Sequence, residues 1–127
     1  MKEIAWLDEH DALLLHDRLL ALYGGAPGVR DLGLLASALA RPRQYFSYTE
    51  VPSIIHGAAL YTAGIVSNHP FVDGNKRTGF VIGVLFLELN GHAFAASEEI
   101  AAKAVIALAS GSMDEVAYAK FLFDNLG

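Results

Sequence analysis

Six polar side chains lie within ten consecutive residues, from His69 to Thr78: a histidine, an aspartate, an asparagine, a lysine, an arginine and a threonine. They stand beside the most apolar stretch of the sequence, which predicts a buried helix over about residues 74–90. Lys76 and Arg77 would lie in the first turn of that helix, where the helix dipole disfavours cations. Their position therefore indicates that an anion binds at the start of this helix.

The residue types around this helix start fit phosphate transfer. Free backbone N–H groups in a first turn bind phosphate oxygens, and Gly74 lets the backbone approach closely. Lys76 would add a point charge, and Arg77 a bidentate hydrogen-bond donor. Asp73 is the one carboxylate of the segment, and carboxylates suit Mg²⁺ beside a phosphate. Histidine titrates near neutral pH, so His69 suits the removal of a proton from a hydroxyl group.

Each of these residues also has an ordinary interpretation when it is taken alone. Asp73 could be only a helix cap, Asn75 a turn residue, and His69 a loop histidine with its hydrogen bonds satisfied. Lys76 and Arg77 could be solvated charges at a helix end. The combination favours an anion site, because all of these residues gather at the entry of one apolar helix and the two cations oppose its dipole.

The segment must be positioned by other helices, because the apolar residues elsewhere recur mostly at spacings of three and four. Typical cap and stop residues delimit these helices. The second helix is expected to end at Ala40, before Pro42, and Arg41 to Pro52 to form an irregular loop or a short hairpin. The pattern predicts an all-α domain of about six helices around a central buried helix at about residues 74–90. The other expected helices follow Asp8 (to Gly24), Asp31 (to Ala40), Ser53 (to Asn68), Ser97 (to Gly111) and Asp114.

Length and composition bound the possible functions. The 127 residues suffice for a single domain spanning residues 1–127, and 54% of them are hydrophobic. The net charge of −5 argues against direct nucleic-acid binding. The absence of cysteine excludes disulfides, cysteine nucleophiles and thiolate metal sites. No apolar run is long enough for a membrane span, and the first residues do not resemble a signal peptide, so we expect a cytoplasmic protein with no membrane partner.

The ten residues His-Pro-Phe-Val-Asp-Gly-Asn-Lys-Arg-Thr, from His69 to Thr78, closely resemble the signature of the Fic/Doc superfamily. Lys76 stands where most Fic enzymes have glycine, as in the death-on-curing (Doc) toxin branch of that superfamily. The resemblance extends over nearly the whole chain. It includes Leu15-His16-Asp17, Gly24-Gly25, the stretch from Gly28 to Pro42, and Leu87 to Gly91.

The resemblance implies the all-helical Fic fold and a site that uses ATP and Mg²⁺. By position, His69 would be the general base, Phe71 would anchor the loop in the core, and Asp73 would bind the metal. The catalytic set would be His69, Asp73, Lys76 and Arg77. The phosphate-binding set would be Gly74, Asn75, Lys76 and Arg77.

The same resemblance implies a toxin of a toxin–antitoxin pair. Most Fic enzymes transfer AMP, whereas the Doc branch acts as a kinase that places the γ-phosphate of ATP on a threonine of elongation factor Tu. Lys76 in place of glycine, and Phe80 in place of the second arginine of the Fic pattern, favour the kinase. The alternatives are AMP transfer to a protein hydroxyl, and a catalytically silent module that binds its antitoxin. The implied antitoxin is a small Phd-type protein that folds onto an apolar groove.

Other polar and aromatic residues leave their interpretation open. The aromatic cluster Tyr45, Phe46 and Tyr48 is either core packing or a flap that positions the target segment. Arg30, with Arg41 and Arg43, is either a surface charge or a border of the cleft. The remaining histidines are expected to be ordinary residues near helix surfaces or ends or, for His56, in an Ala-rich helix: His10, His16, His56 and His92.

Overall fold

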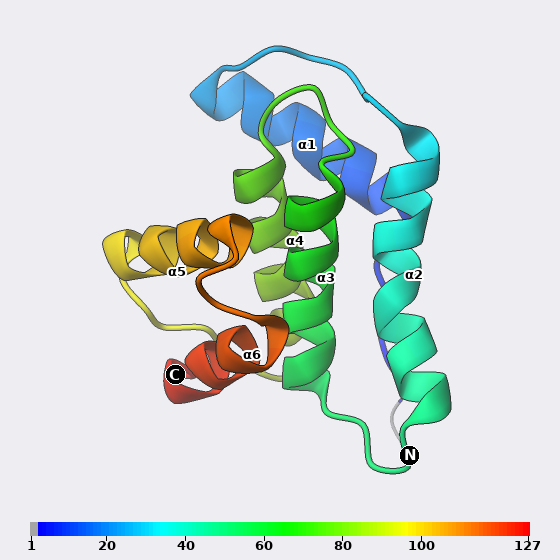
Figure 1. Ribbon diagram of the computed structural model, residues 1–127, viewed down its shortest axis with the longest axis vertical. Helices are drawn as coiled ribbons and strands as arrows, with labels where there is room; N and C mark the ends of the chain where they lie inside the picture. Colours follow the sequence, from blue (N-terminus) through cyan, green and yellow to red (C-terminus); the bar gives the residue numbers. More distant parts are fainter. Residues whose placement is uncertain (1–2) are drawn as a thin grey trace.

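The computed structural model describes residues 3–127, which fold into six α-helices (Figure 1). Within these residues the extended pairing is limited to two isolated bridges, Val29 with Phe71 and Phe94 with Leu126. The all-α fold class is therefore confirmed. The helices are α1 (Glu9–Tyr23), α2 (Leu32–Tyr48), α3 (Ile54–Asn68), α4 (Asn75–Leu89), α5 (Glu98–Ser110) and α6 (Glu115–Asp124).

Side-chain caps begin every helix except α4. Aspartates cap α1, α2 and α6, and serines cap α3 and α5, in each case by accepting hydrogen bonds from free N–H groups of the first turn. These caps confirm the predicted starts. Helix α4 instead begins after Gly74, which has φ of 80° and makes no side-chain cap bond. The first turn of α4 is thus left open for other partners.

The most enclosed helix is α3, not the predicted helix at 74–90. Ten consecutive residues of α3, from Gly57 to Val66, are buried. Helices α2, α4, α5 and α6 all pack against it. Small residues allow this close approach: a Cβ at Gly83 of α4 would lie 3.0 Å from the Ala58 carbonyl oxygen of α3. Helix α4 is buried on one face only, which leaves its other flank available to line a cleft.

The prediction that the second helix ends at Ala40 is wrong. Helix α2 continues through Pro42, which is buried, and ends at Tyr48. A proline inside a helix removes one hydrogen bond and strains the preceding turn. Packing of the following turns offsets this cost, since Phe46 lies edge-to-face against Trp6 with ring centroids 5.1 Å apart. The segment from Arg41 to Tyr48 is therefore helical, and the loop is confined to residues 49–53.

This geometry also settles the interpretation of the aromatic cluster. Tyr45 and Phe46 lie near the end of α2, and the Tyr45 hydroxyl accepts a hydrogen bond from the Ser53 N–H. Helix α3 lies between this end of the molecule and the polar segment after Asn68 (Figure 1). Its 15 residues give it a length of about 22 Å. Tyr45 and Phe46 pack at the end of α2, Tyr48 is exposed, and none of the three lies beside that segment.

Candidate active site

The polar segment forms the connection between α3 and α4, which we call the motif loop (residues 69–74). His69 caps the C-terminus of α3 in the left-handed conformation, with φ and ψ both 54°. Phe71 is fully buried, as predicted, and anchors the loop in the core. The side chains of His69 and Asp73 are exposed on either side of that anchor.

Asn75 holds the motif loop closed from within. Its side chain is buried and makes both backbone hydrogen bonds of Phe71: Oδ1 accepts from the N–H and Nδ2 donates to the carbonyl oxygen, each at 2.9 Å. These bonds occupy both atoms of the amide. Asn75 was predicted to bind phosphate. Because its side chain is bonded to Phe71, only its backbone N–H could take part in phosphate binding.

His16 supports the loop from the α1 side and was missed as a site residue. It is buried, contrary to the expectation of a position near the helix surface. Its ring stacks on Phe71 with centroids 3.8 Å apart, and its Nε2 lies 2.8 Å from the carbonyl oxygen of Asp73. Because a carbonyl oxygen only accepts, Nε2 carries the hydrogen. The available signal was spacing: His16 follows Ala12 by one turn, and these are the two buried residues of α1.

Asp73 presents its carboxylate in a fixed orientation. Oδ2 accepts from the Ala26 N–H at 3.1 Å, and Oδ1 accepts from the Gly74 N–H at 2.8 Å. Hydrogen bonds to the ionised form favour it, so the N–H groups of Ala26 and Gly74 hold the pKa of Asp73 below its usual value. Asp73 is therefore an ionised carboxylate at neutral pH, with lone pairs still facing solvent.

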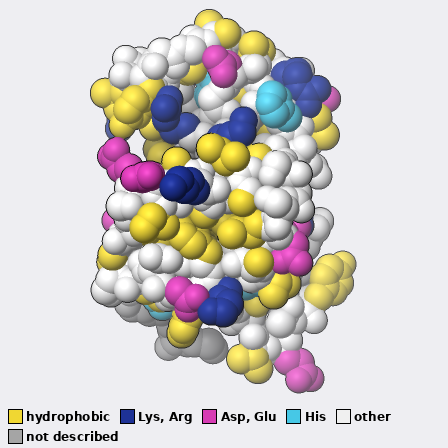
Figure 2. All heavy atoms as spheres, turned by 60° about the vertical axis from the view of Figure 1, so that its left-hand side comes forward, with side chains coloured by type: hydrophobic (Ala, Val, Ile, Leu, Met, Phe, Trp, Pro, Cys, Tyr) yellow, Lys and Arg dark blue, Asp and Glu magenta, His cyan; other side chains and the backbone are white. Residues whose placement is uncertain are grey.

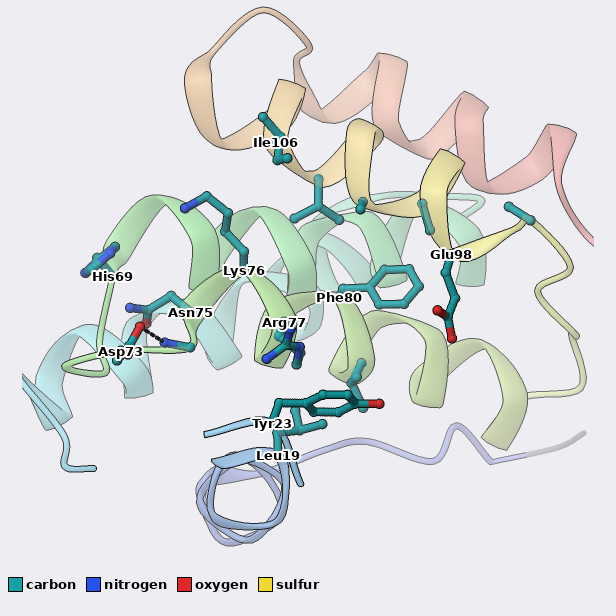
Figure 3. Close-up of a pocket in the computed structure, with 16 residues that line it drawn as sticks. Leu19, Tyr23, His69, Asp73, Asn75, Lys76, Arg77, Phe80, Glu98 and Ile106 are labelled. Carbon is teal, nitrogen blue, oxygen red and sulfur yellow. Dashed lines mark hydrogen bonds between the residues drawn. The ribbon is translucent and has the colours of Figure 1, made fainter. Parts of the chain in front are cut away.

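The predicted site residues meet around one cleft, with a volume of about 680 Å³. Figure 3 shows the cleft with His69 and Asp73 at one end and Lys76 and Arg77 along its floor. The cleft runs between the motif loop, the start of α4, the end of α1 and one face of α5. Its lining comprises Leu19, Tyr23, His69, Asp73, Gly74, Asn75, Lys76, Arg77, Phe80, Val81, Ala96, Glu98, Ala101, Ala102, Val105 and Ile106.

The floor of the cleft could hold an anion. Within residues 3–127, the backbone N–H groups of Asn75, Lys76 and Arg77 have no hydrogen-bond acceptor, and the first N–H bonded back into the turn is that of Thr78. Both cationic side chains are exposed. The Arg77 guanidinium lies 4.2 Å from the ring centroid of Tyr23, which holds it at the cleft wall. Three N–H groups and two cationic side chains thus line the cleft at the positive end of α4, which already favours an anion.

The opposite part of the cleft is apolar. Phe80 and Val81 of α4 face Ala101, Val105 and other residues of α5 across it. Figure 2 shows the same contrast on the surface, with cationic side chains and a histidine above a band of hydrophobic side chains. A ligand with an anionic end and an apolar or aromatic body would match both parts.

The donor set suits a magnesium ion held jointly with phosphate groups. Within residues 3–127 no three His, Asp or Glu side chains are grouped to hold a metal by themselves. Mg²⁺ commonly takes one or two carboxylates and completes its shell with phosphate oxygens and waters. The single carboxylate of Asp73, beside the free N–H groups and cations at the start of α4, fits that pattern. No helix within the same residues is long and apolar enough to cross a membrane.

Comparison with known proteins agrees with the motif. The model of the Fic/DOC family matches residues 6–87, which include the motif loop and its supports. The chain is 32% identical over 95 residues to the protein kinase doc of Escherichia phage P1, covering 75% of each protein. It is 35% identical over 96 residues to the toxin Doc of Mycolicibacterium smegmatis, covering 75% of this chain and 72% of that protein. The chain belongs to the Fic/DOC family.

Proposed function

We propose that this protein is the toxin of a toxin–antitoxin pair and acts as an ATP-dependent protein kinase. It transfers the γ-phosphate of ATP to a threonine hydroxyl, with elongation factor Tu as the acceptor, and so inhibits translation in the cytoplasm. The observation that carries the proposal is the convergence of His69, Asp73, Lys76 and Arg77 on one cleft at the open start of α4. Two relatives named as a Doc kinase and a Doc toxin support it.

Each residue has a distinct part in the proposed reaction. The N–H groups of the first turn of α4, with Lys76 and Arg77, bind the phosphates and stabilise the charge that develops during transfer. Asp73 would hold Mg²⁺, and the bound ion would supply charge neutralisation to the phosphates. His69 lies at the cleft end and removes the proton of the acceptor hydroxyl as that oxygen bonds to the γ-phosphorus and ADP departs.

Lys76 supports transfer of the γ-phosphate over transfer of AMP. In Figure 3 its side chain extends from the first turn of α4 toward the His69 end of the cleft. A glycine there would leave the space over the helix start free for an α-phosphate. The lysine occupies that space with a charged chain, which favours the opposite orientation of the nucleotide and brings its γ-phosphate near His69.

The proposed inhibitor is a Phd-type antitoxin. The apolar wall of the cleft includes side chains that remain accessible in the isolated chain, such as Ile106, which is 55% exposed. A disordered antitoxin segment that folds on binding would bury this wall and cover the cleft at the same time.

A reconstituted translation system tests the proposal. Elongation factor Tu is incubated with the protein, Mg²⁺ and ATP, repurified, and added to a system that lacks this factor. We expect translation to be strongly reduced after treatment with wild-type protein and unchanged after treatment with His69→Ala, or when ATP is omitted. Full translation activity after complete wild-type treatment would contradict the proposed function.

A further inference from the structure

Arg30 and Asp31 donate hydrogen bonds to three successive carbonyl groups at the end of α3, those of residues 68–70. The Arg30 guanidinium donates from Nε to the His69 carbonyl oxygen at 2.7 Å, and from Nη2 to the Asn68 carbonyl oxygen at 2.9 Å. The backbone N–H groups of Arg30 and Asp31 both donate to the Pro70 carbonyl oxygen, at 2.7 and 3.0 Å. Residues outside the motif therefore fix the backbone on which the proposed base stands.

His69 has a backbone conformation that needs such support. It is the one non-glycine residue with positive φ within residues 3–127. The left-handed conformation is unfavourable for a residue with a Cβ atom, and it persists where surrounding contacts impose it. Here it ends α3 and places the imidazole at the end of the cleft (Figure 3).

An arginine fits this position for a chemical reason. Its planar fork can donate to two acceptors at once, and its permanent charge suits the negative end of a helix dipole. A lysine would keep the charge but supply only a flexible point donor. Both acceptors are main-chain carbonyls, so the guanidinium controls the backbone of residues 68 and 69 and leaves the imidazole free.

The segment that carries Arg30 runs alongside the motif loop and makes hydrogen bonds with it. Gly28 accepts a hydrogen bond from the Val72 N–H at 3.1 Å, and the Ala26 N–H donates to Asp73. The two segments lie together at one end of the molecule (Figure 1). The connection between α1 and α2 thus serves as a template, with contacts at both the His69 end and the Asp73 end of the loop.

We propose that Arg30 is a positioning residue for the base His69: its guanidinium holds the end of α3 in the left-handed turn that presents the imidazole to the acceptor hydroxyl. The inference rests on the proposed phosphotransfer for its catalytic consequence. Arg30 acts through the backbone and does not line the cleft, so the proposal predicts an effect on turnover rather than on nucleotide binding.

The test compares Arg30→Ala and Arg30→Lys with Arg18→Ala. Arg18 is an exposed arginine of α1 whose side chain makes no hydrogen bond within the described residues and does not line the cleft. The first measurement is nuclear magnetic resonance of the nucleotide-free protein. We expect Arg30→Ala to shift the amide signals of residues 69 and 71–73, and to raise hydrogen exchange at the Val72 amide by about tenfold or more, as expected for loss of charged hydrogen bonds. Arg18→Ala should leave both unchanged.

The second measurement separates kcat from the KM for ATP. We expect Arg30→Ala to lower kcat by about tenfold or more while the KM stays within about twofold of the wild type, and Arg30→Lys to recover part of kcat. Unshifted loop signals in Arg30→Ala, or a kcat equal to that of Arg18→Ala, would overturn the positioning role. A wild-type protein that is inactive with ATP and elongation factor Tu would overturn the proposed function instead, and the loop signals would still decide whether Arg30 fixes the turn.

Discussion

Replacing Asn75 by alanine should destabilise the whole domain, because the side chain acts as a clamp inside the motif loop. The substitution leaves the buried N–H and carbonyl groups of Phe71 without their partners. Each unsatisfied buried group costs about 1–3 kcal/mol. Allowing for some relief by water, we expect a loss of about 2–4 kcal/mol out of the roughly 5–15 kcal/mol that is typical of a domain.

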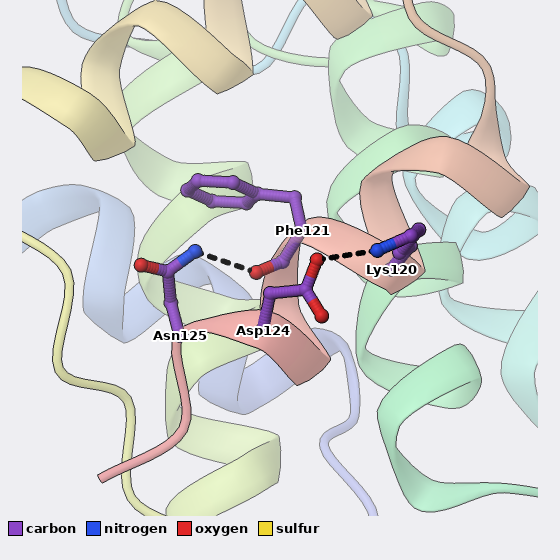
Figure 4. A network of polar contacts seen from close by, with 4 residues as sticks. All are labelled: Lys120, Phe121, Asp124 and Asn125. Carbon is purple, nitrogen blue, oxygen red and sulfur yellow. Dashed lines mark hydrogen bonds and ion pairs between the residues drawn. The ribbon is translucent and has the colours of Figure 1, made fainter.

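For a domain of 127 residues, about 1 kcal/mol corresponds to a change of about 4 °C in Tm. Asn75→Ala should therefore lower Tm by about 8–16 °C, measured by circular dichroism at 222 nm as the temperature rises. Asn125→Ala is the matched control. The Asn125 side chain donates one hydrogen bond to the Phe121 carbonyl oxygen at the end of α6 (Figure 4). Its loss should cost about 1 kcal/mol or less.

The same variant tests what Asn75 does in the site. If the amide only clamps the loop, Asn75→Ala should lose turnover together with loop order, measured by hydrogen exchange at residues 69–74. A Tm within about 2 °C of the wild type would refute the clamp, because the two orphaned groups of Phe71 would then cost almost nothing.

Three further outcomes follow from the structure. Gly83→Ala should destabilise the protein by about 1–3 kcal/mol in urea denaturation, since the new Cβ would meet the Thr62 hydroxyl and lie 3.0 Å from the Ala58 carbonyl oxygen. Burial raises the pKa of Tyr118 to about 12, against about 10 for the unfolded chain, so stability should be intact below pH 10 and fall as the pH rises toward 12. Tyr118→Phe should make that fall shallower in urea denaturation carried out across this pH range. Asp73→Asn should remove the Mg²⁺-dependent part of ATP binding in calorimetry. In the wild type this part should persist on acidification from pH 7 to pH 5, because the pKa of Asp73 is lowered.

Much of the fold could be predicted from local signals. The capping residues Asp8, Asp31, Ser53, Ser97 and Asp114 each begin a helix as expected, because a cap depends on the few residues that follow it. The course of α2 through Pro42 could not be predicted in this way. It depends on contacts of Phe46 with Trp6, which come from a segment 40 residues away.

The candidate site shows the same division. Residue types and spacing pointed to His69, Asp73, Lys76 and Arg77, all of which line the cleft. The role of two supports outside the motif was not predicted, although the spacing of His16 from Ala12 indicated that His16 is buried. His16 and Arg30 lie far from the motif along the chain, and their partners are main-chain carbonyls that carry no residue-specific signal.

Transfer of radioactive label from ATP to elongation factor Tu tests the central claim most directly. Purified protein and Mg²⁺ are incubated with the acceptor and ATP labelled at either the α- or the γ-phosphate, with His69→Ala as the blank. The account predicts label on a threonine of the acceptor from the γ-phosphate alone, and none with His69→Ala. Label from the α-phosphate would contradict the kinase and indicate AMP transfer, and equal labelling by His69→Ala would contradict the role of His69 as the base.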